Sequence, residues 1–192
     1  MRKTRSETEG TRRRIVTTTA RLVRERGIAG VGVAELMKQS GLTHGGFYKH
    51  FSSKDALVAE ACEAALLETH VGLSDIAQKA GDSRGLQAVI ESYLSPTHRD
   101  HPEQGCIIAA AGDEAVRGHS DIRQAISGGT EQLVALVAGH VKADSAGQAV
   151  LQARGIVSTM IGGLTMARAV NDREASDAVL ADVRAFLLSK WA

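Results

Sequence analysis

Residues 33–51 constrain the fold of this chain more than any other stretch. Small or apolar side chains recur there at i, i+3, i+4 and i+7, which predicts one packed face of a short helix. They are Val33, Leu36, Met37 and Ser40. Gly41 can adopt the left-handed conformation that ends a helix, and Thr43 is a good N-cap for a second one. Two short helices joined by a glycine-containing turn are typical of a helix-turn-helix.

The second short helix carries two kinds of side chain. Phe47 and Phe51 lie four residues apart, so we expect both to anchor one face on the core. Gly45 and Gly46 each cost about 1 kcal/mol in a helix interior, which is tolerable where a thin helix must approach DNA closely. In a helix-turn-helix the second helix enters the major groove with its N-terminal residues toward the bases. The alternative, from this stretch alone, is an ordinary amphipathic helix pair.

Charge is divided unevenly along the 192 residues. Residues 1–54 hold twelve Lys or Arg and four Asp or Glu, a net charge of +8. Residues 55–192 hold eleven Lys or Arg and eighteen Asp or Glu, a net charge of −7. A basic run by itself is usually a solvated face. Because this one coincides with the helix-turn-helix, it favours a head that binds DNA phosphates.

Composition excludes several other classes of protein. With 43% hydrophobic residues the chain can bury a core, and no apolar run reaches the ~18 residues typical of a membrane span. The basic start from Met1 to Arg5 has no apolar stretch behind it, so we expect no secretory signal. Two cysteines, Cys62 and Cys106, give no disulfide framework. We therefore expect a cytoplasmic protein with no membrane contact and no cofactor.

The run GLTHGGFYKHF from Gly41 to Phe51, followed by Ser53-Lys54-Asp55-Ala-Leu57, resembles the signature of the tetracycline-repressor (TetR) family of bacterial transcription regulators. The resemblance covers roughly residues 10 to 60. It implies an all-α fold, with a three-helix DNA-binding domain over residues 1–54. It also implies a larger helical domain, residues 55–192, for effector binding and dimerisation. Family membership implies a homodimer that binds operator DNA, usually as a repressor released by an inducer.

Nine residues are the candidate DNA contacts. Thr43 and Tyr48 can reach phosphate through their hydroxyls, and Lys54 resembles the family's phosphate-contacting lysine. Because the helix dipole disfavours cations at a helix N-terminus, an arginine run there also points to phosphate. The full set is Arg12, Arg13, Thr43, His44, Gly45, Tyr48, Lys49, His50 and Lys54. For His50 a structural bond to a neighbouring loop is equally open. Since no Arg or Asn lies on this helix, we expect few base contacts and readout of DNA shape.

The rest of the chain is predicted to be helical. The first helix is expected to begin between Ser6 and Thr11 and to end at Gly27. A long helix follows from a capping box formed by Ser52 and Asp55 to near residue 80. Further helices are expected over 83–95 and 103–117, from 121 onward and in two terminal stretches, with a polar loop over 96–102. Gly128 and Gly129 are expected to weaken or kink one of these helices.

The two terminal helices carry the broadest apolar stripes, which suggest a dimer interface. The residues assigned to it are Val157, Met160, Ile161, Leu164, Val183, Phe186 and Leu187. The alternative is that both stripes pack only within the monomer. In the family the corresponding helices form a four-helix bundle between two subunits. Two-fold symmetry would place the recognition helices about one DNA turn, ~34 Å, apart on a palindromic operator.

Cys106 is the main effector candidate, together with Tyr93 and Ile107. A cysteine near a helix N-terminus gains thiolate character and reactivity. The Gly105-Cys106 pair with a downstream acid, Asp113-Glu114, also resembles a TetR subgroup that includes electrophile- and oxidant-sensing members. The alternative is that Cys106 is a small buried hydrophobe. Cys62 is expected to be inert.

Three other functions stay open as alternatives. His98, His101 and Cys106 could form a metal set, but no fourth ligand follows at zinc spacing, so we predict no metal site. A cysteine-dependent enzyme would need a base, for which only His101 or His119 is available. An architectural DNA-binding protein would lack an inducer and a closed cavity. We favour a repressor released by a small or aliphatic ligand, or by a thiol-reactive compound.

Overall fold

A computed structural model describes residues 5–191. Over that range it holds α-helices and two short 3-10 helices, and no strand. They are α1 (Arg5–Arg26), α2 (Val33–Gln39), η1 (His44–Lys49), α3 (Lys54–Ala80), α4 (Gly85–Tyr93), α5 (Pro96–Asp100), η2 (Pro102–Gln104), α6 (Ile107–Arg117), α7 (Ser120–Ala138), α8 (Ala146–Ala169) and α9 (Arg173–Trp191). The all-α prediction is confirmed.

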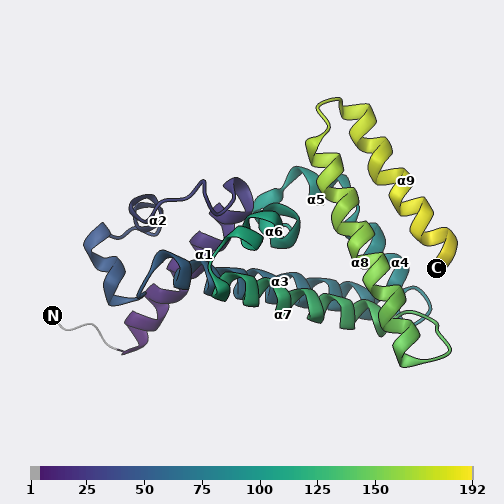
Figure 1. Cartoon of the computed structure of the whole chain (residues 1–192), viewed down its shortest axis with the longest axis horizontal. Helices are drawn as coiled ribbons and strands as arrows, with labels where there is room; N and C mark the ends of the chain where they lie inside the picture. The colour runs from purple at the N-terminus through teal and green to yellow at the C-terminus, as the bar shows by residue number, and fades with distance from the viewer. Residues whose placement is uncertain (1–4, 192) are drawn as a thin grey trace.

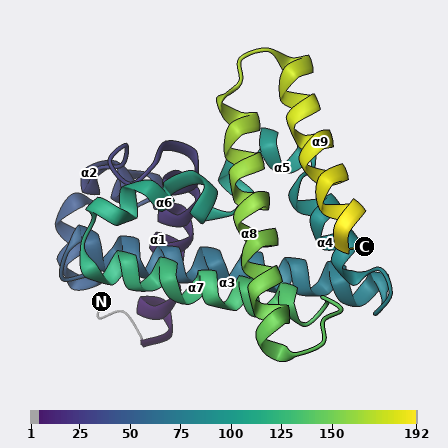
Figure 2. The same cartoon turned by 45° about the vertical axis from the view of Figure 1, so that its right-hand side comes forward.

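Two long helices organise the molecule. α3 and α7 lie side by side through the middle, with α1, α2 and η1 gathered at one end (Figure 1). α8 and α9 form an upright pair at the other end, and both views show them projecting away from the α3–α7 layer (Figure 2). α7 runs unbroken through Gly128 and Gly129, where we expected a weak point. At Gly129 a Cβ atom would collide with Leu66, so the glycine allows the close packing of α7 on α3.

The buried side chains form two cores that share these helices. The first core joins α1, α2, η1 and the first half of α3 to α6 and the start of α7. The second joins the end of α3 to α4, α8, α9 and the end of α7. Cys106 belongs to the second core and its neighbour Ile107 to the first. The start of α6 is therefore the point at which the two cores meet. The division of the chain at residues 54 and 55 stays a prediction, because α6 and α7 also pack in the first core.

Most helix ends follow the local sequence. Gly27 and Gly41 have φ of 75° and 72°, the left-handed conformation expected after α1 and α2. Ser53, not Ser52, caps α3, because its hydroxyl accepts the Ala56 N–H at 3.0 Å. Thr43 occupies the N-cap position of η1, but its side chain makes no capping bond.

Two elements differ from the sequence-based expectation. The second helix of the helix-turn-helix is the 3-10 helix η1, which is consistent with its two adjacent glycines. Residues 96–102 are not a loop. Pro96 opens the short helix α5, since a proline fits the first turn of a helix, and the Ser95 hydroxyl caps it.

Within the described range, every helix is too short or too polar to cross a lipid bilayer.

Candidate DNA-binding head and effector pocket

The segment η1 is held by its two phenylalanines. Phe47 and Phe51 are buried, and their rings stack with centroids 5.9 Å apart. Tyr48 lies between them in sequence and points outward, with 72% of its surface exposed. The ring of Phe47 meets that of Tyr48 edge-on at 5.2 Å. The same short helix therefore has one face in the first core and one face in solvent.

Most of the predicted DNA contacts are exposed on the head, the part of the chain from Arg5 to Lys54. The exposed residues among them are Arg13, Thr43, His44, Gly45, Tyr48 and Lys49. His50 and Lys54 are half-buried. An added Cβ at Gly45 would meet no atom of the protein, so packing inside the chain does not require a glycine there. A glycine there would instead suit the close approach of a partner.

Arg12 is engaged inside the head. Its guanidinium donates to the His50 carbonyl and pairs with Glu60 of α3. It also lies over the Phe51 ring, 4.1 Å from the centroid. These contacts tie α1 to the end of η1 and to α3. The sequence predicts a contact between Arg12 and DNA phosphate. It gives no sign of the ion pair with Glu60, which lies 48 residues further along the chain. We infer that Arg12 positions η1.

Lys54 also has an internal partner. Its ammonium donates to the Ile28 carbonyl at 2.9 Å, in the connection between α1 and α2. On the other side of this connection, Glu114 of α6 accepts the Ile28 N–H at 3.1 Å and the Ala29 N–H at 2.7 Å. A side chain at Gly27 would collide with the same carboxylate. Glu114 therefore fastens α6 to the head, a contact that sequence reasoning did not assign.

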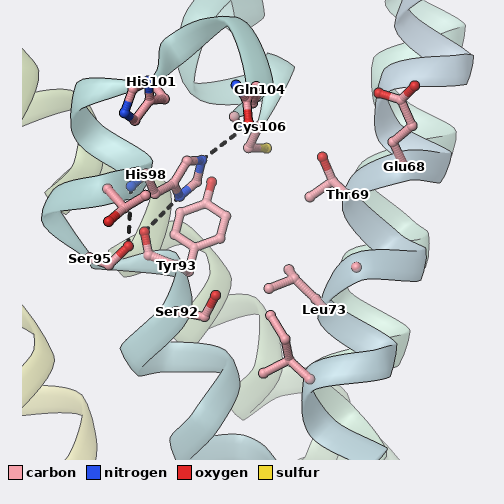
Figure 3. Close-up of a pocket in the computed structure, with 14 residues that line it drawn as sticks. Glu68, Thr69, Leu73, Ser92, Tyr93, Ser95, His98, His101, Gln104 and Cys106 are labelled. Carbon is pink, nitrogen blue, oxygen red and sulfur yellow. Dashed lines mark hydrogen bonds between the residues drawn. The ribbon is translucent and has the colours of Figure 1, made fainter.

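A cavity of about 290 Å³ lies in the body, between α3 and the segment from α4 to Cys106. Its lining includes Leu73, Ile76, Tyr93, His98 and Cys106 (Figure 3). Tyr93 and Cys106, both predicted effector residues, are each 1% exposed. The Tyr93 hydroxyl points toward Cys106 and has no hydrogen-bond partner among the described residues. Ile107 lies outside this cavity, with its side chain in the first core.

Burial sets the ionisation of the cavity wall. It raises the pKa of Tyr93 well above its usual value, and the neighbouring Cys106 adds to the shift. The His98 ring accepts the Cys106 N–H at Nε2 (2.9 Å) and donates from Nδ1 to the Tyr93 carbonyl (2.7 Å). This arrangement needs a neutral ring, and burial lowers the pKa of His98 to about 4. Burial of Cys62 raises the pKa of that thiol to about 12, which supports its expected inertness.

The shifted pKa of His98 predicts a pH-dependent stability. Between its unperturbed pKa of 6.5 and the folded value of about 4, the unfolded chain binds more protons than the folded chain. The free energy of unfolding should therefore fall as pH drops through this window, by up to about 3 kcal/mol from this group. Urea unfolding at pH 7, 5.5 and 4.5 measures the slope. It should be shallower in His98→Gln than in the wild type; equal slopes in the two proteins would contradict the assignment.

Comparison with known proteins places the chain in a family. A sequence profile described as bacterial regulatory proteins, tetR family, matches residues 15–61. A second, described as the tetracyclin repressor-like C-terminal domain, matches residues 83–183, more than half of the chain. The chain belongs to the TetR family. The resemblance seen in residues 10 to 60 is thereby confirmed.

Among TetR-family relatives, the HTH-type transcriptional repressor NemR of Escherichia coli K12 is 27% identical over 129 residues. That alignment covers 66% of this chain and 65% of NemR, so the chain spans less than two thirds of NemR's length in it. The HTH-type transcriptional regulator AcrR of Shigella flexneri is 33% identical over 79 residues, which cover 41% of this chain and 36% of AcrR.

Solved structures share the TetR-family fold over almost the whole chain. The crystal structure of E. coli NemR in its reduced form superposes with a TM-score of 0.80 at 21% identity, over 95% of this chain and 97% of NemR. A TetR-family regulator from Agrobacterium tumefaciens gives a TM-score of 0.79 at 17% identity, over 96% and 100%. At these identities the likeness concerns the fold alone.

The predicted dimer residues of this TetR-family chain divide by burial. Four of them lie in the second core and are at most 2% exposed, namely Val157, Met160, Leu164 and Leu187. Ile161 and Val183 are half-buried, and Phe186 is 48% exposed. The four core residues therefore pack within the protomer, as the alternative interpretation held. The apolar side chains that α8 exposes are instead Leu151 and Met166.

The geometry bears on two of the remaining alternatives, the metal set and the cysteine nucleophile. Both ring nitrogens of His98 are engaged by backbone groups, and residues 5–191 contain no cluster of three metal-ligating side chains. His119 caps α7 by accepting the Asp121 N–H. Within the described chain, no histidine ring nitrogen is hydrogen-bonded to the Cys106 sulfur, the contact that a thiol nucleophile requires.

Proposed function

We propose that this protein is a dimeric DNA-binding repressor of transcription, released from a palindromic operator by an inducer. The observation that carries the proposal is η1. Its phenylalanines fix it to the first core, and Tyr48 and Lys49 face outward next to an exposed glycine. The basic charge of residues 1–54 supplies the attraction to phosphate. Membership of the TetR family and the repressor name of NemR support the same function.

DNA binding can be tested directly. The purified chain should bind duplex DNA from upstream of its own gene more tightly than scrambled duplex of equal length. Because lysine and arginine contacts release counterions, the affinity should fall steeply as salt rises. Fluorescence anisotropy measured at salt concentrations from about 50 to about 200 mM gives both the preference for the upstream duplex and the salt dependence. Equal affinity for the two duplexes would contradict the proposal that the protein binds a specific operator.

The dimer surface is proposed on the exposed sides of α8 and α9. Phe186, Leu151 and Met166 are large apolar side chains that the protomer leaves uncovered. The exposed positions between them on α8 are mostly small, such as Gly155, Ser158 and Gly162, which lets a second helix pair approach closely. Sedimentation should show a dimer for the wild type and a shift toward monomer for Leu151→Glu.

The inducer is proposed to act at the cavity that Cys106 lines. A volume of about 290 Å³ suits a small ligand, and the Cys106 thiol on the cavity wall offers a nucleophile to an electrophilic one. An electrophile such as a maleimide would add to the sulfur. The S–C bond forms, the C=C bond opens, and the thiol proton passes to the adjacent carbon. The adduct would fill the cavity between α3 and α4.

The thiol assignment predicts a specific variant. Cys106→Ser should keep operator affinity and lose release by N-ethylmaleimide, because serine preserves the volume but not the nucleophile. Anisotropy of the operator complex with and without the reagent measures release. Cys62→Ala is the matched control. It should still respond, since Cys62 is fully buried in the first core and its thiol pKa is about 12. A wild type that ignores the reagent would end the sensor proposal and leave DNA binding intact.

A further inference from the structure

A second cavity lies where the head meets the body, and the proposed function makes no use of it. It measures about 530 Å³ and is lined from α1, α5, η2, α6, the end of α8 and the start of α9. Its walls carry four arginines, namely Arg24, Arg99, Arg168 and Arg173, against two acids, Glu25 and Asp100. It shares none of its lining residues with the cavity at Cys106.

Three of the four arginines are neutralised by carboxylates. Arg24 pairs with Glu68 at 3.0 Å. Arg99 binds Asp100 and Asp177, and Arg173 binds Asp100 at 2.8 Å. Asp100 is consequently held ionised, since Arg99 first and then Arg173 lower its pKa. These pairs leave little free charge on that side of the cavity.

Arg168 has no carboxylate partner among the described residues. Its guanidinium donates only to two backbone carbonyls, from Nη2 to His98 at 2.7 Å and from Nε to Arg99 at 3.3 Å. Its Nη1 is buried without any acceptor among the described residues, and so is Nε of Arg24, which lines the same cavity from α1. Burial lowers the pKa of Arg168, and no carboxylate of the described range lies within pairing distance to oppose that shift strongly. An unpartnered buried donor costs about 1–3 kcal/mol, so the Arg168 guanidinium is incompletely satisfied by the protein.

We propose that this cavity binds a small molecule with an oxyanion head group, a carboxylate or a phosphate, whose charge Arg168 neutralises. A guanidinium offers a planar fork of donors that matches both groups. Ala109, Ala110 and Ala167 line the cavity without filling it, so the space beside Arg168 is open to a ligand. Arg24 and Glu25 line the same cavity from α1. A ligand in this cavity would contact α1, α6 and α8 through lining residues that the Cys106 cavity does not share.

Two probes distinguish the possible ligands. Isothermal titration of the full-length protein with inorganic phosphate and, separately, with succinate should give saturable binding for at least one of them at constant ionic strength. Succinamide, of similar size and without charge, should not bind. Arg168→Gln should weaken the binding at least about tenfold, as expected when a charge-assisted hydrogen bond is lost. Arg117→Gln, on the outer end of α6 and beyond the cavity, should bind like the wild type.

A second variant keeps the proposal testable if Arg168→Gln fails to fold. Ala110→Glu introduces a carboxylate on the half-buried cavity wall, and it should abolish binding of both probes while the protein stays folded. The proposal is overturned if neither probe binds the wild type, or if a folded Arg168→Gln or Ala110→Glu binds with wild-type affinity. Neither result would contradict operator binding or release through Cys106, because both are measured separately by anisotropy of a DNA duplex.

Discussion

Tyr48→Ala will weaken operator binding at least about tenfold, and it will lower the free energy of unfolding by only about 1 kcal/mol, the contribution of the edge-on contact with Phe47. The side chain is 72% exposed, so its removal opens no cavity in the core. Its hydroxyl is free to donate to a phosphate oxygen, a charge-assisted bond worth about 1.5–3 kcal/mol, and each 1.4 kcal/mol is about a factor of ten in affinity. Anisotropy with an operator duplex and urea unfolding measure the two quantities.

Two further variants sharpen that result. Tyr48→Phe removes only the hydroxyl and should lose most of the same affinity. Val116→Ala, an exposed apolar position on α6, should behave like the wild type on DNA. If Tyr48→Ala binds the operator as tightly as Val116→Ala, η1 is not the DNA-contacting element.

The helix-turn-helix was predictable because its determinants are local. Gly41 ends α2 through its own φ, and the spacing of Phe47 and Phe51 fixes which side of η1 is buried. The helical type of η1 was not predictable in the same way. Two adjacent glycines indicate a weak helix. Whether that helix forms α-type or 3-10 hydrogen bonds depends on how the residues at its two ends pack against the rest of the protein.

The roles of charged residues could not be read from the sequence, because their partners are distant in it. Arg12 pairs with Glu60, and Lys54 bonds the Ile28 carbonyl, neither of which the sequence indicates; their phosphate contacts stay predictions. The apolar stripes of α8 and α9 present the same difficulty. A stripe marks a face that must be covered, and whether the cover is the same chain or a second one depends on tertiary packing.

The Glu114 carboxylate joins the two halves of the molecule and is the second position where we expect a large effect. It accepts two backbone N–H groups of the connection after α1, while α6 begins directly after Cys106 in the effector cavity. A shift at the start of α6 would therefore move the carboxylate at its other end. Because Lys54 holds the same connection from the side of α3, that shift would be passed to the head near η1.

Glu114→Ala will lower the free energy of unfolding by about 1–3 kcal/mol, since the half-buried Ile28 N–H loses its acceptor. It will also reduce the response to inducer. The ratio of operator affinities without and with N-ethylmaleimide should approach one, while affinity without the reagent persists. Glu114→Gln, which keeps one acceptor oxygen, should fall between this variant and the wild type.

Asp113→Ala provides the matched control for Glu114→Ala. Asp113 is the preceding residue on α6, it is exposed, and it pairs only with Arg117 one turn away. A surface pair of this kind contributes about 0.5 kcal/mol or less, so both the stability and the inducer response should stay close to wild type. If Glu114→Ala matches Asp113→Ala in both measurements, α6 does not carry the signal to the head, and the route must run through α3 and Lys54 alone.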